Sequence, residues 1–249
     1  MTYCVGLRLN RGLVFMSDTR TNAGVDNIST FRKMHLWSIP KDRCIFLMTA
    51  GNLATTQAVV SILEERGKAA GDRSPSVLEQ ASMFQVARLV GATLREVIGE
   101  ARREGQEADS SFNATMIVGG QIGKGKQRLF LVYPEGNFIE ASADTPFFQI
   151  GETKYGKPIL VRAYDPEMEF EDAIKLLLVS FDSTIKANLS VDLPIDFQVY
   201  EDGTLIPGPS GRIEREDKYY RTISDVWGDA LRAAFDSLPD FEMPGEGDA

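Results

Sequence analysis

Apolar positions at the start of the chain follow the spacing expected of β-strands. Residues 3–9 and 13–16 form two short apolar runs, and residues 10–12 (Asn-Arg-Gly) between them are typical of a tight turn. A further apolar run covers residues 44–49, and residues 53–66 then carry apolar side chains at the 3.6-residue spacing of a helix. The chain is therefore predicted to begin with buried strands, followed by a helix.

In the middle of the chain, the spacing of apolar residues changes from that of a helix to that of β-strands. Ser76, with Glu79 three residues later, has the pattern of a capping box, which predicts a long amphipathic helix from there to about Arg103. Beyond this helix the apolar runs are short and are separated by glycine or Pro-Glu-Gly turns. They predict four strands, at residues 115–119, 128–133, 137–141 and 147–150.

The remaining residues predict a helix at 173–186, a hairpin of strands 194–200 and 204–206, and a last helix at 223–238. This order of elements suits an α+β fold with helices on both outer faces of two stacked sheets. No repeat or linker divides the chain, so one domain is expected over residues 2–238. The acidic, Pro- and Gly-rich residues 239–249 are expected to be disordered.

The amino-acid composition argues against several classes of partner and site. The net charge is −9, and the lysines and arginines are scattered among the acids, which argues against nucleic acid or an anionic membrane as a partner. Cysteine occurs only as Cys4 and Cys44, no secretory signal opens the chain, and no apolar run reaches membrane-spanning length. A cytoplasmic protein is expected. With one histidine and two separated cysteines, neither a metal site nor a cofactor is predicted.

Thr2 is the first candidate for chemistry. A methionine that precedes a small residue is commonly removed in the cytosol, and loss of Met1 would leave Thr2 with a free α-amine. That amine has a pKa of about 8, so a fraction of it is neutral at pH 7 and can accept the proton of the adjacent hydroxyl. The residue would then carry both a nucleophile and its base.

Two charged residues are predicted to lie near Thr2. If the first two strands pair antiparallel, the end of the second strand returns beside the start of the first, so Asp18 would lie next to Thr2. Lys33 could approach from the other side, favour the threonine alkoxide and be held by Asp18. The alternative is an exposed ion pair worth less than about 1 kcal/mol. His35 would share a face with Lys33 and either touches the site or is structural.

At these residues the chain resembles the proteasome β-type family of N-terminal nucleophile hydrolases, and is most like its bacterial Anbu group. The matching features are Thr2 before an apolar strand, the Ser17-Asp18-Thr19-Arg20 block, Lys33, and Ala50-Gly51 at a strand end before a helix. The spacing from Thr2 to Asp18, Arg20 and Lys33 fits that of the family to within one residue. The resemblance covers about residues 2–200.

The resemblance implies a fold, an activity and residue roles. The fold would be a four-layer αββα sandwich, and the activity would be hydrolysis of peptide bonds within a ring-like or open-ring homo-oligomer. Thr2 would be the nucleophile, Lys33 its electrostatic activator and Asp18 the residue that orients Lys33. The Gly51 N–H would stabilise the oxyanion, and Arg20 would be structural. Peptides or proteins would be the substrates, with an ATP-dependent partner left open.

One position departs from the family pattern. Glu152 stands where the family usually has a serine that hydrogen-bonds the N-terminal amine, and a carboxylate there would keep this amine protonated. For the family's later aspartate and serine, the nearest matches are Asn188 and Ser190, with Asp182 and Ser183 as second choices. Two alternatives therefore stand beside a peptidase: a catalytically weak or silent scaffold, and a hydrolase of small amides.

Overall fold

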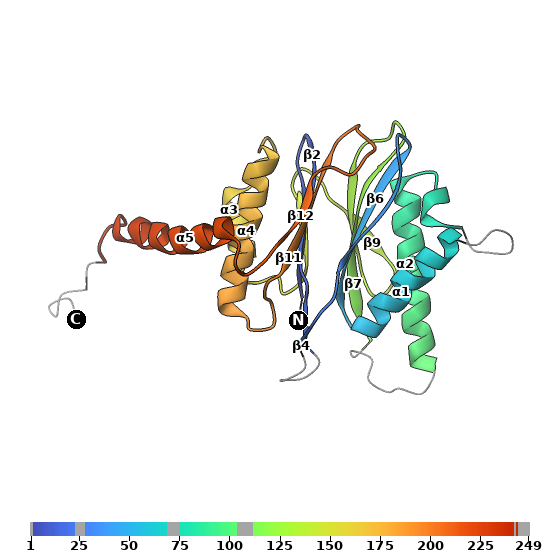
Figure 1. Cartoon of the computed structure of the whole chain (residues 1–249), viewed down its shortest axis with the longest axis horizontal. Coiled ribbons are helices and arrows are strands. Elements are labelled where there is room, and N and C mark those ends of the chain that lie inside the picture. Colours follow the sequence, from blue (N-terminus) through green and yellow to red (C-terminus); the bar gives the residue numbers. More distant parts are fainter. Residues whose placement is uncertain (1, 23–27, 69–74, 104–111, 242, 244–249) are drawn as a thin grey trace.

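The computed structural model describes residues 2–22, 28–68, 75–103, 112–241 and 243 of the chain. Two five-stranded sheets stack face to face, and a pair of helices covers each outer face, as Figure 1 shows. The predicted four-layer αββα sandwich is confirmed.

Every neighbouring strand pair in both sheets is antiparallel. The first sheet runs, in spatial order, β10 (Phe147–Gly151), β1 (Tyr3–Arg8), β2 (Gly12–Asp18), β11 (Ile195–Glu201) and β12 (Ser210–Ile213). The second sheet runs β5 (Met34–Ile39), β6 (Arg43–Gly51), β7 (Ala114–Ile122), β8 (Arg128–Val132) and β9 (Phe138–Glu140). A short ladder of β3 (Arg20–Asn22) and β4 (Ile28–Thr30) connects the two sheets along the chain.

The helices occupy the outer layers. Helices α1 (Leu53–Lys68) and α2 (Met83–Arg103) cover the second sheet. Helices α3 (Lys157–Ala163) and α4 (Phe170–Ala187) cover the first sheet, and α5 (Lys218–Asp236) packs on α4 and projects away from the body (Figure 1).

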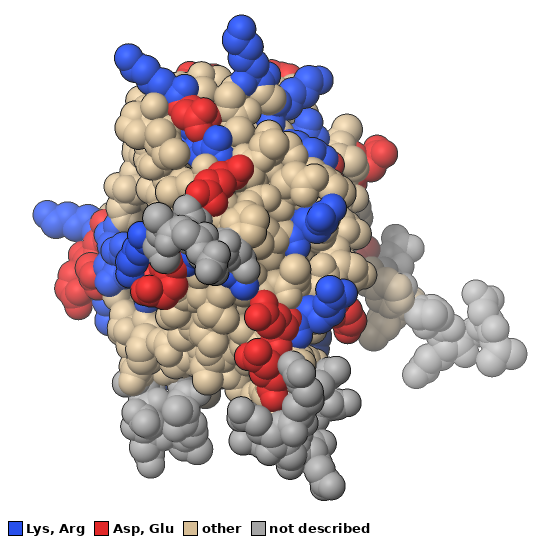
Figure 2. Space-filling model, turned by 90° about the vertical axis from the view of Figure 1, so that its right-hand side faces the viewer, with Lys and Arg blue, Asp and Glu red and all other residues tan. Residues whose placement is uncertain are grey.

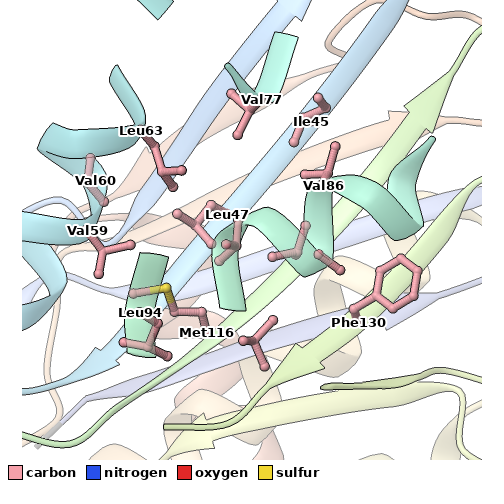
Figure 3. Packing of buried hydrophobic residues seen from close by; sticks show 14 of the residues in the cluster. Ile45, Leu47, Val59, Val60, Leu63, Val77, Val86, Leu94, Met116 and Phe130 are labelled. Atoms are coloured by element: carbon pink, nitrogen blue, oxygen red, sulfur yellow. The ribbon is translucent and has the colours of Figure 1, made fainter. Parts of the chain in front are cut away.

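Three buried clusters fill the spaces between the four layers. Figure 3 shows the cluster between α1, α2 and the second sheet, which includes Val59, Leu63, Val86 and Phe130. A second cluster lies between the two sheets, and a third lies between the first sheet and α4. Strand β1 contributes to both of these, because its alternating side chains face opposite sides of the sheet. This explains why its sequence is a continuous apolar run.

The predicted capping box is present but does not begin the long helix. Ser76 and Glu79 cap only a short 3₁₀ turn at Val77–Glu79, and the chain becomes extended again at Gln80. Helix α2 begins at Met83, where the hydroxyl of Ser82 accepts a hydrogen bond from a backbone N–H at 3.3 Å. The prediction of a helix start at Ser76 was therefore wrong, because the local hydrogen bonds close one turn without committing the chain to a helix.

Two other predictions near the C-terminus also need correction. Residues 204–206 do not form the second strand of a hairpin, since Leu205 adopts a positive φ of 54° and the strand that follows β11 and pairs with it is β12, at residues 210–213. Helix α3 was not predicted. Helix α5 begins before the predicted residue 223, because Asp217 caps it by accepting a hydrogen bond from the Tyr220 N–H at 2.9 Å.

Charges of both signs are interspersed on the face formed by α1 and α2, as Figure 2 shows, and neither sign forms a continuous patch there. Within the described ranges, none of the helices has both the length and the apolar character needed to cross a membrane. Most of the predicted tail, at residues 242 and 244–249, lies outside the described residues.

Candidate active site

Thr2 lies immediately before β1, where backbone pairing fixes its position. Tyr3 pairs with Gly151 in the β1–β10 ladder, and the Glu152 N–H donates a hydrogen bond of 2.7 Å to the Thr2 carbonyl oxygen. Gly151 has a φ of +83°, and a Cβ at this position would lie 1.9 Å from the same oxygen. Only glycine fits there, so the end of β10 is shaped to hold Thr2.

Tyr3, the residue that follows Thr2, is anchored through both its backbone and its side chain. Its N–H donates to Asp18 Oδ1 at 2.9 Å, and its hydroxyl lies 2.7 Å from Ser180 Oγ and accepts from Gln149 Nε2 at 2.6 Å. Burial raises the pKa of Tyr3 to about 12, so the hydroxyl stays protonated. The sequence did not predict that Tyr3 is anchored in this way, because the partners of its hydroxyl lie on β10 and α4, far away in the chain.

Asp18 and Lys33 form an ion pair inside the protein. Lys33 Nζ lies 2.8 Å from Asp18 Oδ1, and the two side chains are 6% and 0% exposed. Lys33 also donates a hydrogen bond of 2.6 Å to the carbonyl oxygen of Arg20. Burial raises the pKa of Asp18 to about 6, while the Lys33 ammonium and the Tyr3 N–H act in the opposite direction. The alternative of an exposed surface pair is wrong.

A buried ion pair of this kind is weak evidence for stability, because removing two charges from water costs about as much as their attraction returns. Perturbed ionisable groups of this type cluster at functional sites. The second oxygen of Asp18 is also buried and has no hydrogen-bond partner among the described residues. The pair is therefore better explained by chemistry than by stability.

Thr2 and Lys33 open onto one cavity of about 870 Å³ between the ends of the sheets and helix α1. Gly51 and Gly151 also line it, as do polar residues that the sequence did not single out: Thr21, Arg32, Thr49, Asn52, Thr56, Gln57, Ser61, Glu64 and Asn113. The structure thus brings Thr2, Lys33 and Gly51 around a single space. Asp18 lies behind Lys33 and is not among the lining residues.

Gly51 ends β6 in a conformation that requires glycine. Its φ is +118°, and a Cβ would lie 2.4 Å from the Asn113 carbonyl oxygen. The next residue, Asn52, caps the start of α1, since its side-chain oxygen accepts a hydrogen bond of 3.0 Å from the Thr55 N–H. The backbone at Gly51 is therefore fixed from both sides where it borders the cavity.

The structure brings Glu152, Asn188 and Ser190 together. Asn188 Nδ2 donates to Glu152 Oε2 at 2.9 Å, and the Ser190 N–H donates to Asn188 Oδ1 at 2.9 Å. The other carboxylate oxygen of Glu152 accepts from the Lys154 N–H at 3.1 Å. The Glu152 side chain is therefore tied to the end of α4, and its backbone N–H is what contacts Thr2.

The second choices, Asp182 and Ser183, are bonded elsewhere. Asp182 is buried and accepts a hydrogen bond of 3.3 Å from the hydroxyl of Tyr220. Ser183 donates to the carbonyl oxygen of Val179 within α4 at 3.0 Å. Neither lines the cavity at Thr2.

Arg20 and His35 occupy the edges of the site. Arg20 Nη1 donates to Asp192 Oδ2 at 2.8 Å, a partner that the sequence analysis did not identify because it is distant in the chain. His35 lines the cavity. Burial, together with the charge of Arg32, lowers the pKa of His35 to about 4, so its ring is neutral at pH 7.

Comparisons with known proteins identify relatives of the whole chain. The family model described as "Proteasome subunit" matches residues 2–193. A Gly-1 mutant of Anbu from Hyphomicrobium sp. strain MC1 is 48% identical, with 98% of this chain and 100% of that chain covered and a TM-score of 0.90. Anbu (ancestral beta-subunit) from Yersinia bercovieri is 45% identical, with 97% and 100% covered and a TM-score of 0.89.

A structure described as the helical assembly of the Anbu complex from Pseudomonas aeruginosa is 41% identical, with 100% of both chains covered and a TM-score of 0.88. The comparison with curated proteins returns no match.

Proposed function

Because the chain belongs to the proteasome subunit family, and within it to the Anbu group, we propose that it is a threonine peptidase whose nucleophile is Thr2 after removal of Met1. The observation that carries the proposal is the buried Lys33–Asp18 pair, whose ammonium borders the same cavity as Thr2. A desolvated cation beside a hydroxyl favours its alkoxide, which is the reactive form.

The proposed reaction proceeds in two steps. In the first, the Thr2 amine accepts the hydroxyl proton, Oγ forms a bond to the peptide carbonyl carbon, and the C–N bond breaks as the proton passes to the leaving amine. In the second, water adds to the resulting ester, with the amine again as base, and releases the acid and the threonine. The Gly51 N–H is proposed to stabilise the negative oxygen in both steps, a contribution of about 3 kcal/mol in comparable sites.

The protein is proposed to act as one domain, residues 2–238, within a homo-oligomer. The support is the helical assembly of the related Pseudomonas aeruginosa protein, together with an apolar helix face on α5 that this chain leaves exposed. A ring or open ring of identical subunits would surround the substrate with several Thr2 sites.

A catalytically silent subunit is the second candidate, and Glu152 is the observation that favours it. Glu152 is 7% exposed and follows the strand end that holds Thr2. A buried negative charge near the Thr2 amine would stabilise the ammonium form and oppose its use as a base. The hydrogen bonds from Asn188 and Lys154 offset this effect, because they withdraw charge from both carboxylate oxygens.

Thr2→Ala tests the peptidase proposal. Alanine still permits removal of Met1 but eliminates the nucleophile, so peptide hydrolysis should fall at least about a hundredfold while folding and assembly are unchanged. The measurements are hydrolysis of a fluorogenic peptide, intact mass to establish the N-terminus, and labelling by an epoxyketone, which reacts with the hydroxyl and the amine of one residue.

Thr2→Ser is the matched control, since it keeps both groups and should retain labelling and measurable hydrolysis. Activity in Thr2→Ala within tenfold of the wild-type rate would exclude Thr2 as nucleophile. A wild-type protein that loses Met1 yet neither reacts with the epoxyketone nor cleaves peptides would favour the silent subunit.

A further inference from the structure

Asp192 lies in the segment before β11 and collects contacts from two distant parts of the chain. Its Oδ2 accepts a hydrogen bond of 2.8 Å from Arg20 and a second one from Arg215, which lies between β12 and α5. Its Oδ1 accepts from the Leu193 N–H at 2.8 Å, so both oxygens are engaged. The Asp192 side chain is 14% exposed, which places this carboxylate largely inside the protein.

The same segment also binds the residue that precedes Arg20. The carbonyl oxygen of Pro194 accepts from the Thr19 N–H at 3.1 Å and from the Thr19 hydroxyl at 2.8 Å. With the Arg20–Asp192 pair, these bonds fix residues 19 and 20 through both backbone and side chain. The carbonyl oxygen of Arg20 is in turn an acceptor for Lys33 Nζ, at 2.6 Å.

A chain of contacts therefore connects the start of the last helix to the lysine beside Thr2. Arg221 of α5 donates to the Arg215 carbonyl oxygen at 3.1 Å, and Arg215 pairs with Asp192. Asp192 then holds Arg20, whose carbonyl oxygen accepts a hydrogen bond from the Lys33 ammonium, as Asp18 Oδ1 does.

We propose that Asp192 is a positioning residue for the hydrolysis at Thr2: it fixes Arg20, and through the Arg20 carbonyl the Lys33 ammonium, and Arg215 links it to α5. The proposal rests on the proposed function, because it assigns Asp192 a role in aligning Lys33. Small displacements of a group that stabilises the reacting atoms reduce rate more than substrate binding, so the effect belongs mainly to kcat.

An ordinary ion pair is the competing explanation, and the chain offers a matched control for it. Arg212 and Asp196 form a second pair, with Nε–Oδ1 and Nη2–Oδ2 distances of 2.6 and 2.8 Å, which joins β12 to β11. Asp192→Asn and Asp196→Asn are the same isosteric change: the first removes the charge that Arg20 and Arg215 face, and the second the charge that Arg212 faces. If Asp192 only stabilises the fold, the two variants should behave alike.

The test compares both variants with the wild-type protein by peptide hydrolysis and by amide hydrogen exchange. Asp192→Asn should lower kcat about tenfold with KM changed by less than about twofold, whereas Asp196→Asn should leave both parameters near the wild-type values. Peptides covering residues 19–22 should exchange faster in Asp192→Asn only. Arg215→Ala should also lower kcat and speed amide exchange at residues 19–22, each by a smaller factor than Asp192→Asn. Arg215→Lys should recover part of the kcat that Arg215→Ala loses.

Equal kcat values for Asp192→Asn and Asp196→Asn would overturn the proposal, as would unchanged exchange at residues 19–22. If Asp192→Asn does not fold, Arg215→Ala carries the test, since it alters a side chain that is 63% exposed. A wild-type protein without hydrolysis or epoxyketone labelling would count against the proposed function alone. The exchange comparison would then still decide whether Asp192 fixes this segment.

Discussion

At the scale of single residues, the site depends on a carboxylate kept where water cannot reach it. Asp18 is fully buried, and its ionised form is held there by the Lys33 ammonium at 2.8 Å and the Tyr3 N–H at 2.9 Å. Protonation of Asp18 would remove the charge that orients Lys33. The catalytic arrangement is therefore expected to be sensitive to pH on the acid side.

The pKa of Asp18 is raised to about 6, because burial disfavours its charged form more than Lys33 favours it. The required form is the carboxylate, which predominates above this pKa, so activity should be lost as pH falls through about 6. The Thr2 amine must also be deprotonated, and a free α-amine ordinarily has a pKa of about 8. We predict that log kcat/KM rises with a slope near two below pH 6 and near one between pH 6 and 8.

This profile is measured with one fluorogenic peptide across pH 5 to 9. Asp18→Asn should have a much lower rate and lose the steeper segment, because no carboxylate remains to titrate at that position. A slope near one throughout the acid range of the wild-type enzyme would show that Asp18 does not control the rate.

At the scale of elements, close backbone approach at glycines fixes how strands and helices meet. Gly151 lets β10 pass beside the Thr2 carbonyl oxygen, and Gly91 lets α2 approach the turn at Gly136, where a Cβ on Gly91 would lie 2.2 Å from the carbonyl oxygen. Both contacts are tight. Only the first lies at the proposed active site.

We predict that Gly151→Ala and Gly91→Ala each destabilise the fold by at least about 1 kcal/mol, the first through its positive φ and both through steric overlap. Thermal unfolding measures this effect. Among the folded molecules, only Gly151→Ala should lose most of its kcat, because it displaces Thr2 from the Lys33 side of the cavity. A Gly151→Ala enzyme with wild-type kcat would contradict the placement of Thr2 by β10.

At the scale of the whole molecule, α5 extends beyond the four layers (Figure 1). It carries large apolar side chains that are exposed to solvent. The exposed fractions of Leu231, Phe235 and Leu238 are 49%, 74% and 63%. Leu231 and Phe235 are four residues apart and so share one face of α5, and Leu238 follows just beyond the end of the helix. A patch of this kind on a projecting helix is typical of an interface between subunits.

We predict that the double variant Leu231→Glu, Phe235→Glu dissociates the proposed homo-oligomer, because it places two charges on the apolar face of α5. Light scattering at micromolar concentration should show a smaller molar mass. Arg232→Glu is the matched control: it introduces the same side chain on the polar face of α5, at a position 81% exposed, and should leave the mass unchanged. An unchanged mass in the double variant would locate the main interface elsewhere.

Short-range patterns in the sequence determined most of the framework. Apart from β5, apolar runs and their spacing predicted the strands of both sheets up to β11, because alternation along a strand depends only on near neighbours. The closeness of Asp18 to Thr2 followed from the same logic, since consecutive strands joined by a tight turn must pair in antiparallel register. The resemblance to the proteasome family rested on these same local positions.

Only the tertiary structure decided the contacts between segments distant in sequence. The bonds from Asn188 to Glu152 and from Arg20 to Asp192 join residues whose approach depends on how α4 and the first sheet stack. The capping box at Ser76 also shows the limit of a local rule, because its hydrogen bonds close a single 3₁₀ turn and the chain is extended again at Gln80 before α2 begins. Hydrogen-bonding patterns specify single turns and pairs, whereas the stacking of layers selects which distant side chains meet.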